Sequence, residues 1–194
     1  TPNEDIAALR AIPEMTIVDI CDTVMASKLL PQIADTYGTF FIRYPRTSIP
    51  RVYDESMEFE LGKSVQLREG KDLTIIASGI EVSEALDAAE MLSQEGIEAR
   101  VIDMFTIKPL DTAAVEAAAR ETGAIVTAEN HNMHGGLGSA VAEYLVEHCL
   151  VPMERVANMD RFGDVGSLRY LMDEYELSAK FIAATAKQVL SRKA

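Results

Sequence analysis

Three arginines in an acidic chain are the residues whose types and spacing first suggest chemistry. Arg43, Arg46 and Arg51 lie in or next to the run Phe41 to Pro50, where a predicted strand ends. A guanidinium group is planar and charged, and it can hold a phosphate or a carboxylate with two hydrogen bonds. The alternative is a set of surface ion pairs with nearby acids, which is the more common outcome for an isolated trio. An anion-binding site is therefore a hypothesis that needs further support.

A second group of candidate residues lies in a loop predicted from Glu129 to Gly138. Glu129, His131 and His134 are residue types that bind metals. The chain has neither a cysteine pair nor a helical H-x-x-x-H motif to accompany them, so we expect no metal site.

The same loop holds three glycines. Gly135, Gly136 and Gly138 would let backbone N–H groups point outward at the start of the next helix, which suits an anion or a partner's carboxylate. The alternative, which the sequence alone favours, is that they permit close packing of helix and strand. No G-x-G-x-x-G, P-loop, G-x-S-x-G or Ser-His-Asp arrangement is present, so the sequence does not support dinucleotide binding, nucleotide hydrolysis or serine-hydrolase chemistry.

Composition excludes several classes of partner. The chain has 194 residues, 48% of them hydrophobic, and a net charge of −13. Such an acidic protein is poorly suited to nucleic acid or to an anionic membrane surface. No apolar run approaches the roughly 18 residues of a membrane span, and we find no signal peptide. From these absences we expect a soluble, cytoplasmic protein. Cys21 and Cys149 cannot form a disulfide framework, so we expect both to stay reduced thiols.

Strand-like and helix-like runs alternate along most of the chain. This alternation predicts an α/β fold with a mainly parallel sheet covered by helices over residues 72–194. The expected strands are Leu73 to Ala77, Ala99 to Asp103, Ala124 to Ala128 and Val151 to Ala157. A helix is expected after each of the first three strands, and a last one from Ala179 to Leu190.

Local signals predict where two of these helices begin and end. Ser78 and Glu81 have the spacing of a capping box, and Gly96 suits a left-handed stop. Asp111 is the expected N-cap of the next helix, which Gly123 ends.

The first 55 residues are predicted to contain too little structure for a core of their own. We expect a helix at 5–10, a strand at 15–20, a helix after Asp22 that is interrupted by Pro31 and closed by Gly38, and a strand at 39–43. Two strands and two helices must lean on the later domain or be the tail of a larger one. Residues 56–71 read as a linker with a small hairpin, formed by 59–61 and 65–67 around Gly62.

Four motifs in order resemble the carboxyl-terminal part of transketolases, and most closely the carboxyl-terminal subunit of split transketolases. They are Ile6 to Thr16, Phe41 to Pro50, Val101 to Asp111, and Glu129-Asn130-His131 followed by Gly135-Gly136-Leu137-Gly138. The resemblance implies that residues 1–55 are the remnant of a pyrimidine-binding domain. It further implies that 72–194 form the complete transketolase C-terminal domain.

The resemblance also implies roles for single residues. Arg46 falls where the family has an arginine that grips the phosphate of the sugar phosphate, and Arg43 is a weaker candidate for the same role. Glu129, His131 and the three glycines are assigned to a subunit interface or to the rim of the site. The family's catalytic and cofactor-binding residues lie upstream of this chain, so no catalytic, cofactor-binding or metal-binding residue is expected in it.

The resemblance implies a parent enzyme that moves a two-carbon ketol unit between sugar phosphates, as in the pentose phosphate pathway. Such an enzyme uses thiamine diphosphate and a divalent metal, Mg or Ca. This chain is expected to supply dimerisation and a phosphate clamp, to pair with itself and/or an amino-terminal transketolase portion, and to be inactive alone. The alternatives are a fragment of deoxyxylulose-phosphate synthase or of a 2-oxoacid dehydrogenase beta subunit, and a non-catalytic interaction module.

Overall fold

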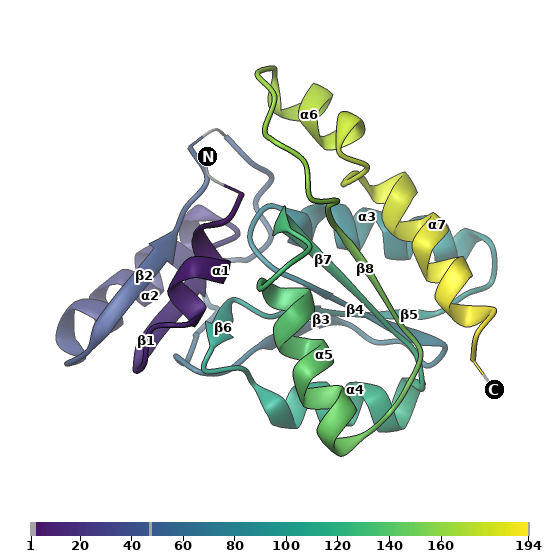
Figure 1. Ribbon diagram of the computed structural model, residues 1–194, viewed down its shortest axis with the longest axis horizontal. Coiled ribbons are helices and arrows are strands. Elements are labelled where there is room, and N and C mark those ends of the chain that lie inside the picture. The colour runs from purple at the N-terminus through teal and green to yellow at the C-terminus, as the bar shows by residue number, and fades with distance from the viewer. Residues whose placement is uncertain (1–2, 47, 194) are drawn as a thin grey trace.

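The computed structural model describes residues 3–46 and 48–193 and contains two sheets that lie side by side (Figure 1). The expected α/β class is confirmed. The elements, in chain order, are α1 Asp5–Arg10, β1 Met15–Asp19, α2 Thr23–Asp35, β2 Thr39–Arg43, β3 Val65–Arg68, β4 Leu73–Ala77, α3 Glu81–Gln94, β5 Ala99–Asp103, β6 Thr106–Lys108, α4 Thr112–Thr122, β7 Ile125–Asn132, α5 Leu137–His148, β8 Met153–Asn158, α6 Leu168–Glu174 and α7 Ala179–Leu190. No helix among the described residues has the length and apolar character that a membrane crossing needs.

The second sheet has the strand order β3-β5-β4-β7-β8 and is parallel except for β3. Helices α3 and α7 cover one face, and α4 and α5 cover the other (Figure 1). The two neighbouring isoleucines of β4 explain why this strand is buried throughout, because Ile75 packs in the core under α3 and α7 and Ile76 in the core under α4 and α5. Alternation along a strand sends successive side chains to opposite faces.

The first sheet has the order β2-β1-β6, and its third strand comes from the later part of the chain. β1 and β2 run parallel, and β6, which the sequence did not predict, pairs with β1 in the antiparallel sense. Phe105, just before β6, is fully buried in a core that also holds Met25 and Leu29 of α2. The first 55 residues therefore lean on the later domain, as expected for a segment with too few strands.

The local caps of α4 were predicted correctly. Asp111 accepts a hydrogen bond from the N–H of Ala114, and Gly123 ends the helix with a left-handed backbone. Gly96 likewise follows α3 with a positive φ of 81°.

The predicted capping box of α3 is wrong. The helix begins at Glu81, and the hydroxyl of Ser78 donates to Asp19 at 2.9 Å instead of capping it. Glu81 is fully buried, and neither of its carboxyl oxygens has a hydrogen-bond partner among the described residues. A partner distant in sequence therefore overrides the local spacing.

The predicted break of α2 at Pro31 and its end at Gly38 are also wrong. The helix continues through Pro31 and ends at Asp35. The proline costs one backbone hydrogen bond, but the buried face of α2, which includes Met25, Leu29 and Ile33, outweighs that cost.

The predicted hairpin in residues 56–71 does not form. Phe59 is buried, with its ring edge-on to those of Tyr53 and Phe105. Residues Val65–Arg68 form β3 and pair with the edge of β5 instead. The edge of a large sheet offers more backbone hydrogen bonds and a covered face, which an isolated two-stranded hairpin lacks.

Candidate functional site

A groove of about 580 Å³ lies where carboxyl ends of strands from the two sheets meet. Asp19 ends β1 and Arg43 ends β2, while Ile80 follows β4 and Asn130 lies near the end of β7. Ligands of open α/β sheets bind at this edge. The other wall of the groove, here called the far wall, is formed by residues 164–166, which precede α6, and by residues 168 and 171 of α6.

Arg46 lines this groove, as the anion-binding hypothesis requires. It is exposed, just beyond the end of β2, beside Tyr44 and Pro45. It forms no hydrogen bond or ion pair with any residue in the described part of the chain. Thr47, the next residue of the motif that suggested its role, lies outside the described residues. The guanidinium group of Arg46 is thus available for an anion from solution.

Arg43 also lines the groove, but its side chain is buried and committed to the protein. Its Nε donates to Asp5 at 3.1 Å, a terminal nitrogen donates to the carbonyl of Asn130 at 3.0 Å, and another lies 3.6 Å from Asp19. Burial lowers the pKa of Arg43, but the carboxylates of Asp19 and Asp5 more than offset it, so the pKa is raised. Arg43 therefore ties α1, β1, β2 and β7 together.

The acids around Arg43 are buried too. Burial raises the pKa of Asp19, and Arg43 and the Ser78 hydroxyl oppose that rise. Burial also raises the pKa of Glu81 well above its usual value, and the neighbouring Glu84 adds to the effect. Sequence reasoning missed Asp19 and Glu81, because only the fold brings these two distant residues to one junction.

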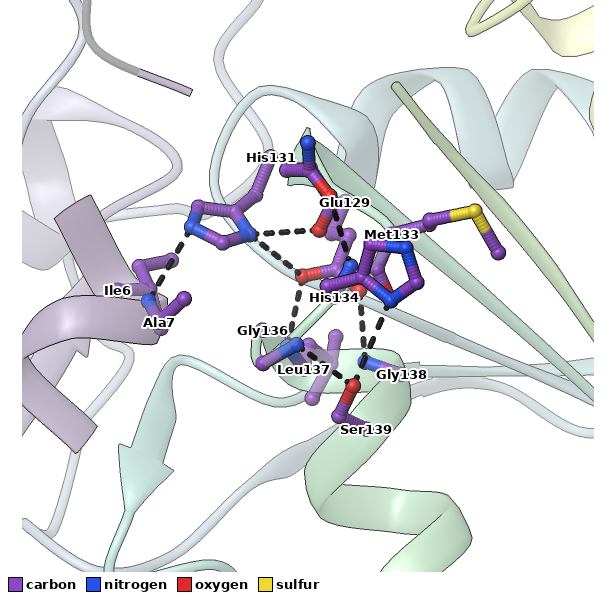
Figure 2. A network of polar contacts seen from close by, with 12 residues as sticks. Ile6, Ala7, Glu129, His131, Met133, His134, Gly136, Leu137, Gly138 and Ser139 are labelled. Carbon is purple, nitrogen blue, oxygen red and sulfur yellow. Dashed lines mark hydrogen bonds and ion pairs between the residues drawn. The ribbon is translucent and has the colours of Figure 1, made fainter. Parts of the chain in front are cut away.

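Glu129 lies in β7, which continues to Asn132, so the loop predicted from Glu129 is shorter than expected. Its carboxylate accepts hydrogen bonds of 2.7 Å from the N–H groups of both Leu137 and Gly138 at the start of α5 (Figure 2). Burial raises its pKa to about 7, although the N–H groups of Gly138 and Leu137 oppose that rise. The N–H groups at the start of α5 are therefore paired with a carboxyl group that the chain itself provides.

The glycines around Glu129 allow this close approach. A Cβ on Gly136 would lie 1.9 Å from the Glu129 carboxylate, and one on Gly138 would lie 2.8 Å from side-chain atoms of Arg155 and Thr127. A Cβ on Gly135 would lie 2.6 Å from that of Ala7 in α1. The packing interpretation of these glycines is thus the one that the geometry supports.

His131 is fully buried between α1 and the second sheet (Figure 2). Its Nδ1 lies 2.8 Å from the carbonyl of Asn132, which can only accept, so Nδ1 carries the hydrogen. Nε2 then accepts from the N–H of Ala7 at 3.3 Å. Burial lowers the pKa of His131, which keeps the ring neutral. None of the five residues predicted for an interface or site rim is among those that line the groove.

The far wall of the groove was not predicted. Helix α6 does carry a helix signal in its sequence: Ser167 caps it by accepting from the N–H of Tyr170, and Leu168, Leu171, Met172 and Tyr175 recur at helical spacing.

Comparison with known proteins places the chain in a family. Residues 62–182 match the family described as "Transketolase, C-terminal domain". The 6-deoxy-6-sulfo-D-fructose transketolase subunit of a Clostridium species is 47% identical over 98% of this chain and 59% of its own length. A subunit of the apulose-4-phosphate transketolase of Phocaeicola vulgatus is 40% identical over 97% of this chain and 60% of its own length.

A solved structure is also similar. It is a split-gene transketolase described as an inactive beta4 tetramer, with a TM-score of 0.97 and 40% identity. The similarity covers all of this chain and 64% of that one. The chain thus spans about 60% of the length of these relatives.

Proposed function

The chain belongs to the transketolase family, in which it matches about 60% of the length of the carboxyl-terminal subunits of split enzymes, and from this premise we propose that its parent enzyme transfers a two-carbon ketol unit between sugar phosphates. In this proposal the chain supplies assembly surfaces and one phosphate clamp, and it is inactive alone. Residues 1–55 are the tail of a pyrimidine-binding domain, and 72–194 are the C-terminal domain.

The observation that carries the clamp is the contrast between two arginines in one groove. The donors of Arg43 are turned to Asp5, Asp19 and Asn130, whereas Arg46 is exposed and meets no described partner. An uncommitted guanidinium fork fits the geometry of a phosphate and forms charge-assisted hydrogen bonds with it. We assign Arg46 to the phosphate of the sugar substrate.

The names of the relatives support a substrate with an anionic end. One relative is named for a 6-sulfo sugar and the other for a 4-phosphate. We propose sugar phosphates of the pentose phosphate type for this chain's parent.

The described residues offer no site made of three metal-binding side chains for the divalent metal of the family's cofactor. Thiamine diphosphate binds with a divalent cation, and the described residues include no group of three His, Cys, Asp or Glu side chains that could hold one. We therefore propose that thiamine diphosphate and its Mg or Ca ion are held elsewhere in the complete enzyme. The residues of this chain then act on the substrate's anionic end.

Two observations support partners. Both curated relatives are named as subunits, which supports an amino-terminal transketolase subunit or portion as a partner of this chain. The solved relative is a tetramer of one kind of chain, which supports self-association as well. A cytoplasmic location is part of the proposal, in keeping with the free thiols of Cys21 and Cys149.

Reconstitution tests this function. The full-length protein is mixed with the amino-terminal transketolase subunit of the same organism, thiamine diphosphate and Mg²⁺, and supplied with xylulose 5-phosphate and ribose 5-phosphate. We expect ketol transfer by the mixture and none by either protein alone, with a raised KM for the sugar phosphates in Arg46→Ala. Transfer from pyruvate to glyceraldehyde phosphate instead would assign the parent to the deoxyxylulose-phosphate synthase alternative. No transfer in either assay would contradict the proposal.

A further inference from the structure

Glu81, the first residue of α3, is a buried acid that the proposed function leaves unexplained. Its side chain is fully buried, and neither of its carboxyl oxygens has a hydrogen-bond partner among the described residues. An ionised carboxylate in such a place is very costly, because it loses its hydration without gaining hydrogen bonds or a counter-charge. The neutral form avoids this cost, so folding favours a proton on Glu81.

The charges around Glu81 favour its neutral form as well. Burial raises the pKa of Glu81 most, and the acids Glu84 of α3, Asp19 of β1 and Glu129 of β7 raise it further. Each of these three acids has partners of its own, which Glu81 lacks among the described residues. The partners are Arg169 and the N–H of Ala179 for Glu84, Arg43 and the hydroxyl of Ser78 for Asp19, and Arg155 with the N–H groups of Leu137 and Gly138 for Glu129. The acid without partners is thus the one that depends on a proton.

The turn between β4 and α3 connects Glu81 to the groove. Ile80, the residue before Glu81, lines the groove. The hydroxyl of Ser78 donates to Asp19 at 2.9 Å, and a Cβ on Gly79 would lie 2.6 Å from the same carboxylate. This turn therefore fits closely against the end of β1, and it forms part of the groove one residue away from Glu81.

Loss of the proton from Glu81 would act on the groove in two ways. The new carboxylate can regain water only if the first turn of α3 moves, and that movement carries Ile80 with it. A negative charge buried near the groove also lowers its affinity for an anion, because charges inside a protein are poorly screened. Both effects weaken anion binding at Arg46.

We propose that Glu81 is a positioning residue for the phosphate clamp: its neutral carboxyl group keeps the turn before α3 in place, and its ionisation releases this turn and weakens anion binding at Arg46. The inference rests on the proposed function, in which Arg46 binds the phosphate of the substrate. It goes further, because it names the group that makes the clamp depend on pH.

The experiment titrates the full-length protein with sulfate at constant ionic strength. Sulfate is the probe because it stays doubly charged across neutral pH, whereas a phosphate changes its charge there. Binding and amide hydrogen exchange are both followed by NMR. The test variants are Glu81→Met and Glu81→Gln, which cannot ionise, and far-UV circular dichroism confirms that they fold. The matched control is Glu90→Gln, which removes an exposed acid of the same helix.

The wild-type protein should bind sulfate at least about fivefold more weakly at about pH 9 than at about pH 6. Over the same range, exchange of the amides of residues 78–82 should rise by more than the intrinsic rate does. In both Glu81 variants the affinity should change by less than about twofold. Asp103 and Glu129 titrate in all of these proteins, so the difference between wild type and variants isolates Glu81. Glu90→Gln should behave as wild type.

Other outcomes overturn the inference in distinguishable ways. If the wild-type affinity does not fall with pH, or falls equally in the Glu81 variants, Glu81 does not control the groove and the proposed function stands. If the affinity falls without extra exchange in residues 78–82, charge alone acts and the positioning role is wrong. If wild type binds no sulfate at any pH, or Arg46→Ala binds it equally well, the phosphate clamp fails and the inference fails with it.

Discussion

The two sheets of this molecule obey the same packing rules but differ in how far they stand alone. The second sheet is covered by helices on both faces. Four of its five strands are parallel and lie next to one another in the order β5-β4-β7-β8. The first sheet has three short strands, one of them borrowed from residues 106–108, and shares its core with the second through Phe105. Its carboxyl edge is nevertheless where Arg43 and Arg46 lie. The less independent sheet thus carries the candidate chemistry, and the more independent one supports it.

The largest expected effect comes from breaking the shared core. Phe105→Ala should lower the free energy of unfolding by about 3–5 kcal/mol, because it leaves a large cavity between the sheets. We expect a single urea transition by circular dichroism and tyrosine fluorescence, with the exposed Tyr37→Ala as a neutral control. A separate early transition of the first sheet would show that it folds independently.

The next effect separates the two arginines. Arg43→Met should cost about 3 kcal/mol at pH 8, because it leaves Asp19 and Asp5 buried without their cation. At pH 5 the cost should shrink, because an unpaired, buried Asp19 takes up a proton more readily. Arg46→Met should change stability by less than about 0.5 kcal/mol. If both variants lost the same free energy of unfolding in urea denaturation, Arg43 could not be distinguished from Arg46 as the structural residue.

The second sheet could be predicted from the sequence far better than the junction between the two sheets, where Asp19 and Ser78 meet. The runs at Leu73 and Ala99 and the caps at Asp111 and Gly123 depend on neighbours within a few residues, so local patterns were sufficient. Ser78 and Glu81 also had a local pattern, but Asp19, 59 residues away, takes the Ser78 hydroxyl. Strand β6 has only three residues and exists because β1 offers it an edge. Arg46 could be predicted to lie at the end of β2 because its motif is local, and its role as a phosphate clamp stays a prediction, whereas the far wall of the groove depends on how α6 packs.

A pH-dependent effect is expected at the end of β5. Asp103 is fully buried and accepts a hydrogen bond of 2.8 Å from Tyr53 of the preceding segment. Burial raises its pKa to about 7, against the opposing effect of the Tyr53 hydrogen bond. The folded state therefore binds this proton more tightly than the unfolded state, and stability falls as the pH rises from about 4 to about 7.

Asp103→Asn should remove this share of the pH dependence. Between pH 5 and pH 8 we expect the variant to lose about 2 kcal/mol less stability than wild type, measured by urea denaturation at each pH. The exposed Asp54→Asn should keep the wild-type slope. An unchanged slope in Asp103→Asn would mean that the carboxyl is ionised in the folded protein throughout this range.

The smallest effect tests the close packing of Gly136 against Glu129 at the N-terminus of α5. Gly136 has an ordinary φ of −87°, so Gly136→Ala should lose about 1–2 kcal/mol because its Cβ meets the Glu129 carboxylate and lies 2.7 Å from Nδ1 of His131. Gly96→Ala has open space around its Cβ but a φ of 81°, and should lose about 1 kcal/mol from backbone strain alone. In a Glu129→Gly background the cost of Gly136→Ala should shrink to what the contact with His131 causes, while the cost of Gly96→Ala should stay the same. Equal effects of Glu129→Gly on both would contradict the packing role of Gly136.

The most direct test of the central claim compares a phosphorylated with an unphosphorylated donor in the reconstituted enzyme. If Arg46 grips the phosphate, Arg46→Ala should lower kcat/KM for xylulose 5-phosphate at least about tenfold and leave that for xylulose within about twofold. Arg51→Ala, in which the lost arginine is already paired with Glu55, should leave both values near wild type. An equal fall for both donors in Arg46→Ala, or no fall for either, would contradict the account.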